Sequence, residues 1–327
     1  MSEIDLSQKL DLLKKYGLRT IELLGIGGTS EVTLVENQEG ARFALKRLLG
    51  QYRAQRLWRD RLLLEGVHLT MARSNRVITC REVLSVPLPQ SLIKISVDQD
   101  PSALPLSARK EVALLLDFVP GVHLRALLKE AHRTKNPLKY DEIASMIWDI
   151  SRGLKALHEA ERGRGRSCPI THGDLSPTNI MLDRTGAAIL IDLSSAKSEL
   201  TPEDGLIRPG KRAYSSPGRL EGEEEAIEGD LYALACIWFE LITGSVPKIS
   251  HNELSWRALH EAGWPIMWAK IVYGLLSDAP QVRLRMIEHL NRESLWGEDR
   301  QSHADQLKEA RLSLASRVRS VTDRRQS

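Results

Sequence analysis

Apolar and polar residues alternate in much of the first third of the chain, a pattern typical of half-buried strands. Strand-like segments occur at 18–24, 31–35, 42–48, 76–84 and 112–119. A glycine cluster follows the first, and a turn at 37–40 precedes the third, so the first three predict short antiparallel strands. Residues 52–71 instead carry apolar side chains at helical spacing with few breakers, which predicts one helix.

Four prolines interrupt the segment 85–110, which lies between the last two predicted strands. Proline cannot donate a ladder hydrogen bond, so this segment is unsuited to the interior of a sheet. We interpret it as an insertion, with a hairpin around residues 92–97.

Helical periodicity dominates after Pro120 and Gly121. The predicted helices lie at 123–135, 141–161, 229–243, 253–260, 265–276 and 283–291. Two short strands are predicted among them, at 180–182 and 188–191. The polar tail has apolar residues at helical spacing between 304 and 320 with arginines opposite, which favours a helix packed on its own protein over a membrane or partner helix. Together these elements predict an α+β fold with two lobes.

Composition narrows the class of protein without identifying it. The chain has 327 residues, of which 42% are hydrophobic and 27% charged, which is ordinary for a globular protein. We expect a cytoplasmic protein without a membrane span, because no apolar stretch approaches the length of a spanning helix. Three cysteines without a Cys-x-x-Cys pair argue against a disulfide framework and a structural zinc site. A net charge of +3 gives no argument for nucleic acid.

The first candidate site is the glycine-rich turn Gly25-Ile26-Gly27-Gly28, which has strands on both sides. Glycines let backbone N–H groups approach phosphate oxygens closely. A ligand-free hairpin explains this segment equally well when it is taken alone. A dinucleotide-binding turn is disfavoured, since a strand rather than a helix follows the glycines.

Two further groups of polar residues carry more information. Lys46 closes an apolar strand, and Glu65 on the following helix could fix its ammonium group beside a phosphate. The stretch His172 to Asn179 contains Asp174, and Asp192 ends the next apolar strand. Their order and spacing place one base beside two oxygen ligands of the kind that suits Mg²⁺.

With these motifs, the chain resembles the eukaryotic-type serine/threonine protein kinases, including their many bacterial members, from about Leu18 to about Leu295. Asp117 to Gly121 is similar to the hinge of that family. Residues 229–244 resemble the helix whose buried Asp steadies the catalytic loop, and Tyr214 to Pro217 resembles the end of the activation segment.

The resemblance implies a protein-kinase-like fold. It divides the chain into an N-terminal extension at 1–17, an N-lobe at 18–117 with the insertion, a C-lobe at 118–296 and a tail helix at 297–327. It also implies ATP and Mg²⁺ as cofactors and protein substrates that carry Ser or Thr. The oligomeric state cannot be read from the sequence.

The resemblance also implies a role for each matching residue. Lys46 and Glu65 would hold the phosphates, Asp174 would accept the substrate proton, and Asn179 and Asp192 would bind the metal. Further nucleotide contacts are implied at Gly25, Ile26, Gly27, Gly28, Val32, Ala44, Leu116, Asp117 and Val119.

The chain departs from the family pattern at several positions. Gly173 replaces an arginine that reads activation-loop phosphate in many kinases, so we expect no control of that kind. Leu193 and Gly218 also differ from the pattern. Ser176 stands in the place of a catalytic-loop lysine and Lys211 in the place of a threonine. We hypothesise that Lys211 is catalytic and restores the missing positive charge near Asp174.

The same residues also allow other interpretations. Lys211 could be an exposed residue in a basic turn with Arg208 and Arg212. The departures from the pattern also allow a pseudokinase that acts as a nucleotide-binding interaction module. The sequence His172-Gly173-Asp174 is similar to that of small-molecule phosphotransferases as well. Transfer to a protein Ser or Thr hydroxyl is the reading that the remaining motifs favour.

Overall fold

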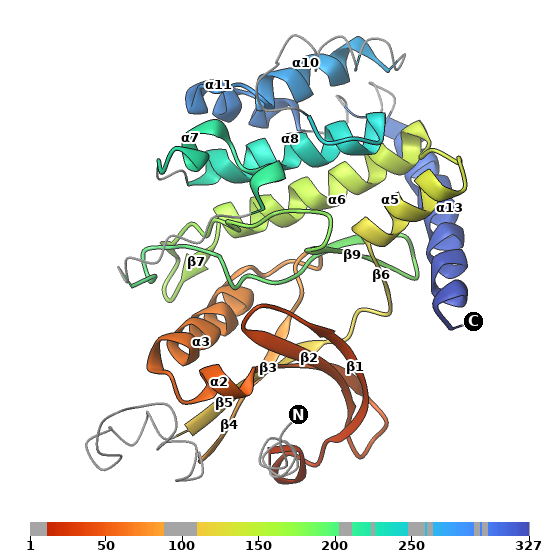
Figure 1. Ribbon diagram of the computed structural model, residues 1–327. Coiled ribbons are helices and arrows are strands. Elements are labelled where there is room, and N and C mark those ends of the chain that lie inside the picture. Colours follow the sequence, from red (N-terminus) through yellow and green to blue (C-terminus); the bar gives the residue numbers. More distant parts are fainter. Residues whose placement is uncertain are drawn as a thin grey trace. The chain divides into compact units, whose positions relative to one another are not determined.

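The chain forms two compact units in a computed structural model (Figure 1). The structure describes residues 12–87, 110–202, 211–223, 226–247, 264–290 and 300–326, together with Leu259 and Leu295. The N-terminal unit comprises Met1–Thr70 and Ile78–Phe118, and the C-terminal unit comprises Met71–Val77 and Val119–Ser327. The predicted hairpin at 92–97 and nearly all of the predicted helix 253–260 lie outside the described residues.

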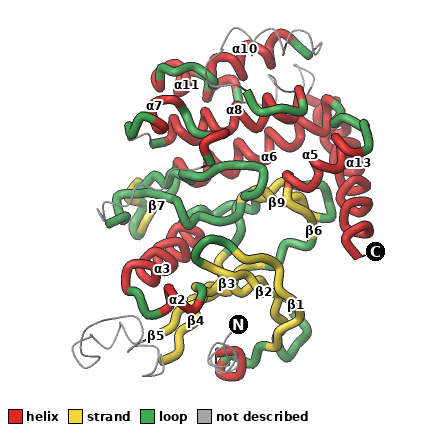
Figure 2. The backbone as a smooth tube through the Cα atoms, viewed as in Figure 1, coloured by secondary structure: helices red, strands yellow, loops and turns green. Residues whose placement is uncertain are grey.

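The N-terminal unit contains a five-stranded antiparallel sheet in the order β1-β2-β3-β5-β4, drawn in yellow in Figure 2. The strands are β1 (Arg19–Ile26), β2 (Ser30–Glu36), β3 (Arg42–Leu48), β4 (Cys80–Pro87) and β5 (Lys110–Asp117). Its core is formed by apolar residues of the strands and by Leu12 and Leu13, which precede β1. The described part of the predicted N-terminal extension is therefore packed against the sheet.

The single helix expected at 52–71 is instead two helices, α2 (Gly50–Arg53) and α3 (Arg56–Met71). Arg53 is buried and donates from Nε to the Leu48 carbonyl at 2.8 Å. Its guanidinium also lies near Glu111, with Nε 3.4 Å from Oε1. These contacts with β3 and β5 hold Arg53 inward and explain why the helix does not run through this point.

The C-terminal unit is mainly helical. Its helices are α5 (Leu124–Arg133), α6 (Tyr140–His158), α7 (Pro217–Leu220), α8 (Ile227–Thr243), α10 (Ile266–Leu275), α11 (Pro280–Arg285) and α13 (Arg300–Gln326), with 3₁₀ turns η3 (Arg212–Tyr214) and η4 (Ile287–His289). Its strands are β6 (Gly121–His123), β7 (Glu161–Arg162), β8 (Arg166–Ser167), β9 (Ile180–Asp183) and β10 (Ala188–Leu190). Helix α8 packs against α6, α10 and α11 (Figure 1), and most of its residues are buried.

Two further sequence-based expectations differ from the observed elements. The strand expected at 76–84 begins only at Cys80, because Arg76 instead contacts Asp149 of α6 at 2.8 Å. The helix expected at 283–291 starts earlier, with Pro280 in its first turn, and ends at Arg285 before η4. Proline favours the first turn because its missing N–H needs no partner there.

Helix α13 packs along α6 and α5 in the C-terminal unit. Arg311 lies 2.7 Å from the fully buried Asp149 carboxylate, and Arg317 lies 2.7 Å from the Glu142 carboxylate. Among the described residues, no helix is both long enough and apolar enough to cross a bilayer. The polar tail is thus tied to its own unit by charged groups as well as by apolar contacts.

Candidate active site

The N-terminal unit holds a buried ion pair between strand β3 and helix α3. Lys46 Nζ lies 2.6 Å from Glu65 Oε1 and 2.9 Å from Oε2. Only 4% of Lys46 and 2% of Glu65 is exposed. A buried charge is costly without a partner, so each side chain supplies the counter-charge of the other and fixes its orientation. The pair predicted from sequence is therefore assembled within this unit.

Strand register places the predicted nucleotide contacts of this unit on one face of the sheet. Val32 is directly opposite Lys46, and Ala44 is directly opposite Leu116. Opposed residues in antiparallel strands project to the same side, and so do residues two apart in one strand. Val32, Ala44, Lys46 and Leu116 consequently line the same face, with Lys46 among apolar neighbours.

Asp117 and Val119, two other predicted nucleotide contacts, do not belong to this face of apolar residues. The Asp117 side chain pairs with Arg81, with Nη2 2.9 Å from Oδ2, and the Asp117 N–H donates to the Thr79 carbonyl at 3.0 Å. The Asp117 N–H is therefore engaged within its own unit. Val119 belongs to the C-terminal unit.

The glycine-rich turn joins β1 to β2. Gly27 N–H donates to the Ser30 carbonyl at 2.7 Å, which closes the turn. A Cβ atom added at Gly25 or Gly28 would meet no atom of the chain within 4 Å, and neither residue has a positive φ. Ile26 in the same turn is 65% exposed. Packing within the protein and backbone conformation therefore give no reason for glycine at positions 25 and 28.

The catalytic-loop motif lies in the C-terminal unit and is anchored on Asp230 of α8. The Asp230 carboxylate accepts from the His172 N–H at 2.7 Å and the Gly173 N–H at 3.0 Å. His158 Nε2 lies 2.9 Å from the same carboxylate. Burial alone raises the pKa of Asp230, but the hydrogen bonds and the imidazoles outweigh it and keep the pKa below its ordinary value.

Gly173 is required by the local backbone. Its φ is +75°, and a Cβ atom there would lie 2.4 Å from the Ser195 carbonyl oxygen. An arginine at this position would meet both strain and a clash. The departure of Gly173 from the family pattern is therefore built into the course of the loop.

Asp174 and Asn179 contact each other across the loop. Asn179 Nδ2 donates to the Asp174 carbonyl at 2.7 Å and to Asp174 Oδ2 at 3.0 Å. These bonds fix the amide so that its nitrogen faces Asp174, which leaves the amide oxygen as the ligand atom.

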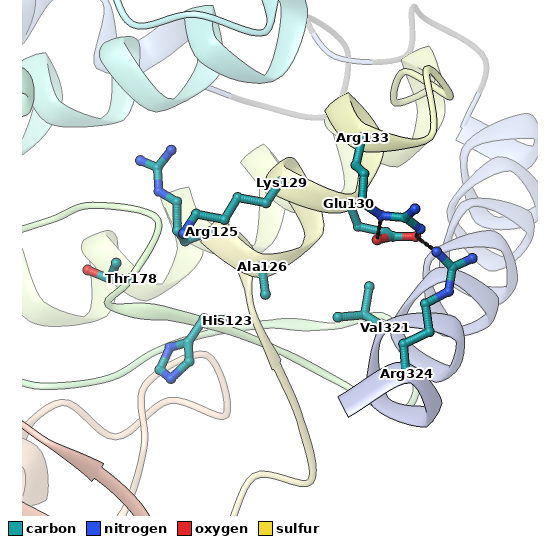
Figure 3. Close-up of a pocket in the computed structure, with 9 residues that line it drawn as sticks. All are labelled: His123, Arg125, Ala126, Lys129, Glu130, Arg133, Thr178, Val321 and Arg324. Carbon is teal, nitrogen blue, oxygen red and sulfur yellow. Dashed lines mark hydrogen bonds and ion pairs between the residues drawn. The ribbon is translucent and has the colours of Figure 1, made fainter. Parts of the chain in front are cut away.

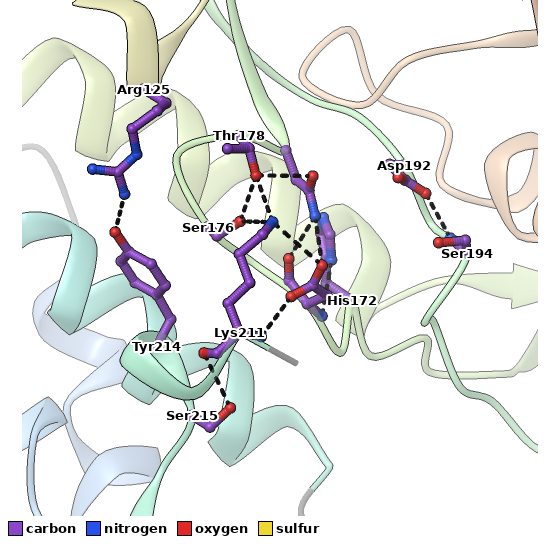
Figure 4. Close-up of polar contacts among 11 residues, drawn as sticks. Arg125, His172, Ser176, Thr178, Asp192, Ser194, Lys211, Tyr214 and Ser215 are labelled. Carbon is purple, nitrogen blue, oxygen red and sulfur yellow. Dashed lines mark hydrogen bonds and ion pairs between the residues drawn. The ribbon is translucent and has the colours of Figure 1, made fainter. Parts of the chain in front are cut away.

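Lys211 reaches this loop from the segment before η3 (Figure 4). Its backbone N–H donates to Asp174 Oδ1 at 3.0 Å, and its Nζ lies 3.6 Å from Asp174 Oδ2. Nζ also donates to Ser176 Oγ at 2.8 Å and to Thr178 Oγ1. The structure thus brings a positive charge beside Asp174, and two hydroxyl groups hold it there. Thr178 is a member of this cluster that we did not single out from the sequence.

Asp192 follows β10 and has a left-handed backbone with φ +65°, which is unusual for a residue other than glycine. The Ile191 N–H donates to the Asn179 carbonyl at 2.9 Å, and the Ser194 N–H donates to Asp192 Oδ1 at 3.1 Å. Because Ile191 directly precedes Asp192, the first bond ties the backbone beside Asp192 to Asn179. Strained backbones of this kind cluster at functional sites.

The oxygen donors fit a magnesium ion shared with a nucleotide. Asn179 and Asp192 offer one amide and one carboxylate, and Mg²⁺ is commonly held by one or two protein groups together with phosphates and water. Among the described residues, no group of three or more His, Cys, Asp or Glu side chains could hold a metal ion alone.

Residues 18–293 match the family model "Protein kinase domain". Serine/threonine-protein kinase A of Synechocystis sp. is 26% identical over 145 residues, which cover 42% of this chain and 27% of that protein. Serine/threonine-protein kinase PknD of Mycobacterium tuberculosis is 31% identical over 134 residues, or 40% of this chain and 18% of that protein. Tyrosine-protein kinase MasK of Myxococcus xanthus is 26% identical over 145 residues, or 43% of this chain and 22% of that protein. The matches thus span about a quarter or less of these relatives' lengths.

Proposed function

Because this chain belongs to the protein kinase family, we propose that it transfers the γ-phosphoryl group of ATP to Ser or Thr hydroxyl groups of protein substrates, with Mg²⁺. The observation that carries the proposal is the cluster in which Lys211 Nζ and Asn179 Nδ2 both contact the Asp174 carboxylate. Such a cluster supplies a base and a cation at one point, which is what phosphoryl transfer to a hydroxyl requires.

Residues of the N-terminal unit bind and orient the phosphates in this proposal. Lys46 donates to them from a position that Glu65 fixes, at 2.6 Å from its ammonium group. The open space around Gly25 and Gly28 supports a role for the turn, since close approach of an outside group is a reason for glycine that internal packing does not supply. Val32, Ala44 and Leu116 offer apolar contact to the base on the same face of the sheet.

Asp174 receives the proton in the transfer step. The substrate oxygen loses its proton to an Asp174 carboxylate oxygen and forms a bond to the γ-phosphorus, while the bond from that phosphorus to the bridging oxygen breaks and ADP leaves. Asn179 and the Lys211 N–H orient the carboxylate through bonds of 3.0 Å each. Lys211 Nζ neutralises the phosphoryl oxygens at the position that Ser176 leaves without charge.

Asn179 and Asp192 are the residues that hold Mg²⁺ in this proposal. Mg²⁺ held by these residues would neutralise negative charge on the nucleotide phosphates. The backbone bond between Ile191 and Asn179, at 2.9 Å, and the Ser194 N–H that binds Asp192 Oδ1, at 3.1 Å, hold the two oxygen donors in place. The chain's own contribution is the orientation of these donors.

Gly173 bears on regulation. The arginine that reads activation-loop phosphate in many kinases is absent here, and the Ser195 carbonyl occupies the space that any side chain at this position would need. We therefore propose that activity is not controlled by an activation-loop phosphate that a catalytic-loop arginine reads.

A phosphoryl-transfer assay tests the proposal. Wild-type protein with labelled ATP and Mg²⁺ should phosphorylate itself or a Ser/Thr peptide, and the label should be found on phosphoserine or phosphothreonine. Asp174→Asn should lose at least about a thousandfold in kcat while it keeps its affinity for ATP. Label on phosphotyrosine would correct the substrate class, and nucleotide binding without transfer by the wild type would overturn the proposal in favour of a pseudokinase.

A further inference from the structure

A basic pocket lies beside the catalytic loop in the C-terminal unit (Figure 3). It has a volume of about 430 Å³, enough for one or two side chains. Its lining residues come from β6, α5, the catalytic loop and α13: His123, Arg125, Ala126, Lys129, Glu130, Arg133, Thr178, Val321 and Arg324.

The pocket carries more positive charge than its own carboxylates neutralise. Arg133 and Arg324 share one partner, Glu130, as the dashed lines in Figure 3 show. Arg125 pairs with Glu240 at 2.6 Å. Lys129 is exposed and has no ion pair or hydrogen bond within the described part of the chain. The lining thus contains four cationic side chains and one carboxylate, Glu130, while Glu240 of α8 lies outside it, and the exposed Lys129 favours an anionic occupant.

The pocket is attached directly to the proposed catalytic cluster. The Arg125 N–H donates to the Pro177 carbonyl at 2.9 Å, so the first turn of α5 is bonded to the catalytic loop. Thr178 lines the pocket and also accepts from Lys211 Nζ, which lies 3.6 Å from Asp174. Thr178 and Lys211 therefore form a series of contacts from the pocket lining to the Asp174 carboxylate.

We propose that this pocket binds an acidic side chain of the protein substrate, close in sequence to the hydroxyl that is phosphorylated. The proposal rests on the proposed function and names its substrate class. An extended peptide advances about 3.3 Å per residue, so one segment can fill both the pocket and the place beside Asp174. Charge complementarity selects Asp or Glu, and the apolar side chains of Ala126 and Val321 complete the lining.

The test uses two peptides that contain the same serine. One carries Asp and Glu around the serine, and the other carries Asn and Gln at the same positions. The wild type should phosphorylate the acidic peptide with a kcat/KM about tenfold higher, and added salt should reduce the difference. Lys129→Glu should abolish the preference or reverse it toward a peptide with Lys at those positions. Lys270→Glu changes an exposed lysine on α10 in the same unit and should keep the wild-type preference.

Fluorescence anisotropy with the labelled acidic peptide, without ATP, separates failure of this proposal from failure of the proposed function. If neither peptide is phosphorylated but the acidic one binds and Lys129→Glu weakens it, the pocket assignment stands alone. The pocket assignment would be overturned by equal kcat/KM values for the two peptides, or by a preference that Lys129→Glu leaves unchanged. If neither peptide is phosphorylated, failure of the acidic peptide to bind would also overturn it. Binding to phosphatidylserine vesicles without any choice between the peptides would also overturn it, in favour of a lipid surface.

Discussion

Lys46 in the N-terminal unit is fixed by a carboxylate nineteen residues later on the adjoining helix, whereas Lys211 in the C-terminal unit is held by hydroxyl groups 33 and 35 residues away. The first cation is 4% exposed and the second has a side chain 44% exposed. Lys46 is thus fixed by a buried counter-charge, whereas Lys211 is a more exposed cation that hydroxyl groups hold near the Asp174 carboxylate. The difference indicates that a buried ion pair sets the position of the first cation, while the second depends on hydroxyl partners from the catalytic loop.

The two cations should also differ in what they contribute, and the largest effect is expected at Lys46. Lys46→Met combined with Glu65→Gln removes both buried charges, so the variant should fold. We expect kcat/KM for ATP to fall about a thousandfold, with a higher KM for ATP, because phosphate binding is lost. Lys155→Met, which changes an exposed lysine with a side chain 70% exposed, should retain full activity. An unchanged KM for ATP in the double variant would contradict the phosphate role.

The next expected effect concerns the stability of the N-terminal unit. Burial lowers the pKa of His68 on α3 to about 4. Between about pH 6.5 and pH 4 the unfolded chain binds a proton that the folded chain excludes, so the free energy of unfolding falls as the pH decreases through this window. The loss is on the order of 3 kcal/mol.

Denaturation at a series of pH values checks this prediction. His68→Gln should flatten the curve below pH 6.5, and the control His132→Gln, which changes an exposed residue of α5, should leave it unchanged. A wild-type curve and a His68→Gln curve that run parallel would show that His68 does not titrate in this way.

Lys211 should affect the rate of transfer more than nucleotide binding. Lys211→Met is expected to lower kcat about a hundredfold with little change in KM for ATP, because its ammonium group contacts the Asp174 cluster. Arg212→Met alters the adjacent exposed residue and should change kcat less than about threefold, as the structure places it outside that cluster. Equal losses in the two variants would indicate that Lys211 is only a surface residue.

The smallest expected effect concerns the stability of the C-terminal unit, at a buried carboxylate outside the candidate active site. Arg311→Ala removes one of two arginines that contact the fully buried Asp149 carboxylate, and burial already raises the pKa of Asp149 despite them. We expect the free energy of unfolding to drop by about 2 kcal/mol, since Arg76 still compensates part of the charge. Urea denaturation should show this loss, while Arg319→Ala on the exposed side of α13 should show none.

Local spacing was sufficient for the parts of the site built from neighbouring elements. Lys46 and Glu65 are nineteen residues apart, with only the short helix α2 between β3 and α3, and the sequence predicts their pairing. The compensating position of Lys211 was a hypothesis from two coupled departures at Ser176 and Lys211, and the structure places its ammonium group beside Asp174. Its catalytic role stays a prediction.

Features that depend on distant contacts could not be predicted. The break after α2 depends on Arg53 reaching Glu111, and the late start of β4 depends on Arg76 reaching Asp149. The basic pocket joins α5 to Arg324 at the far end of α13, and no local pattern connects these segments.

In the proposed mechanism, Lys211 provides, from a different sequence position, the positive charge that phosphoryl transfer requires beside Asp174. The kcat of ATP-dependent peptide phosphorylation should be measured for the wild type, Lys211→Thr, Ser176→Lys and the double variant Ser176→Lys/Lys211→Thr. We predict that Lys211→Thr loses about a hundredfold and that the double variant recovers to within about tenfold of the wild type. Full activity in Lys211→Thr, no recovery in the double variant, or no transfer by the wild type would contradict the claim.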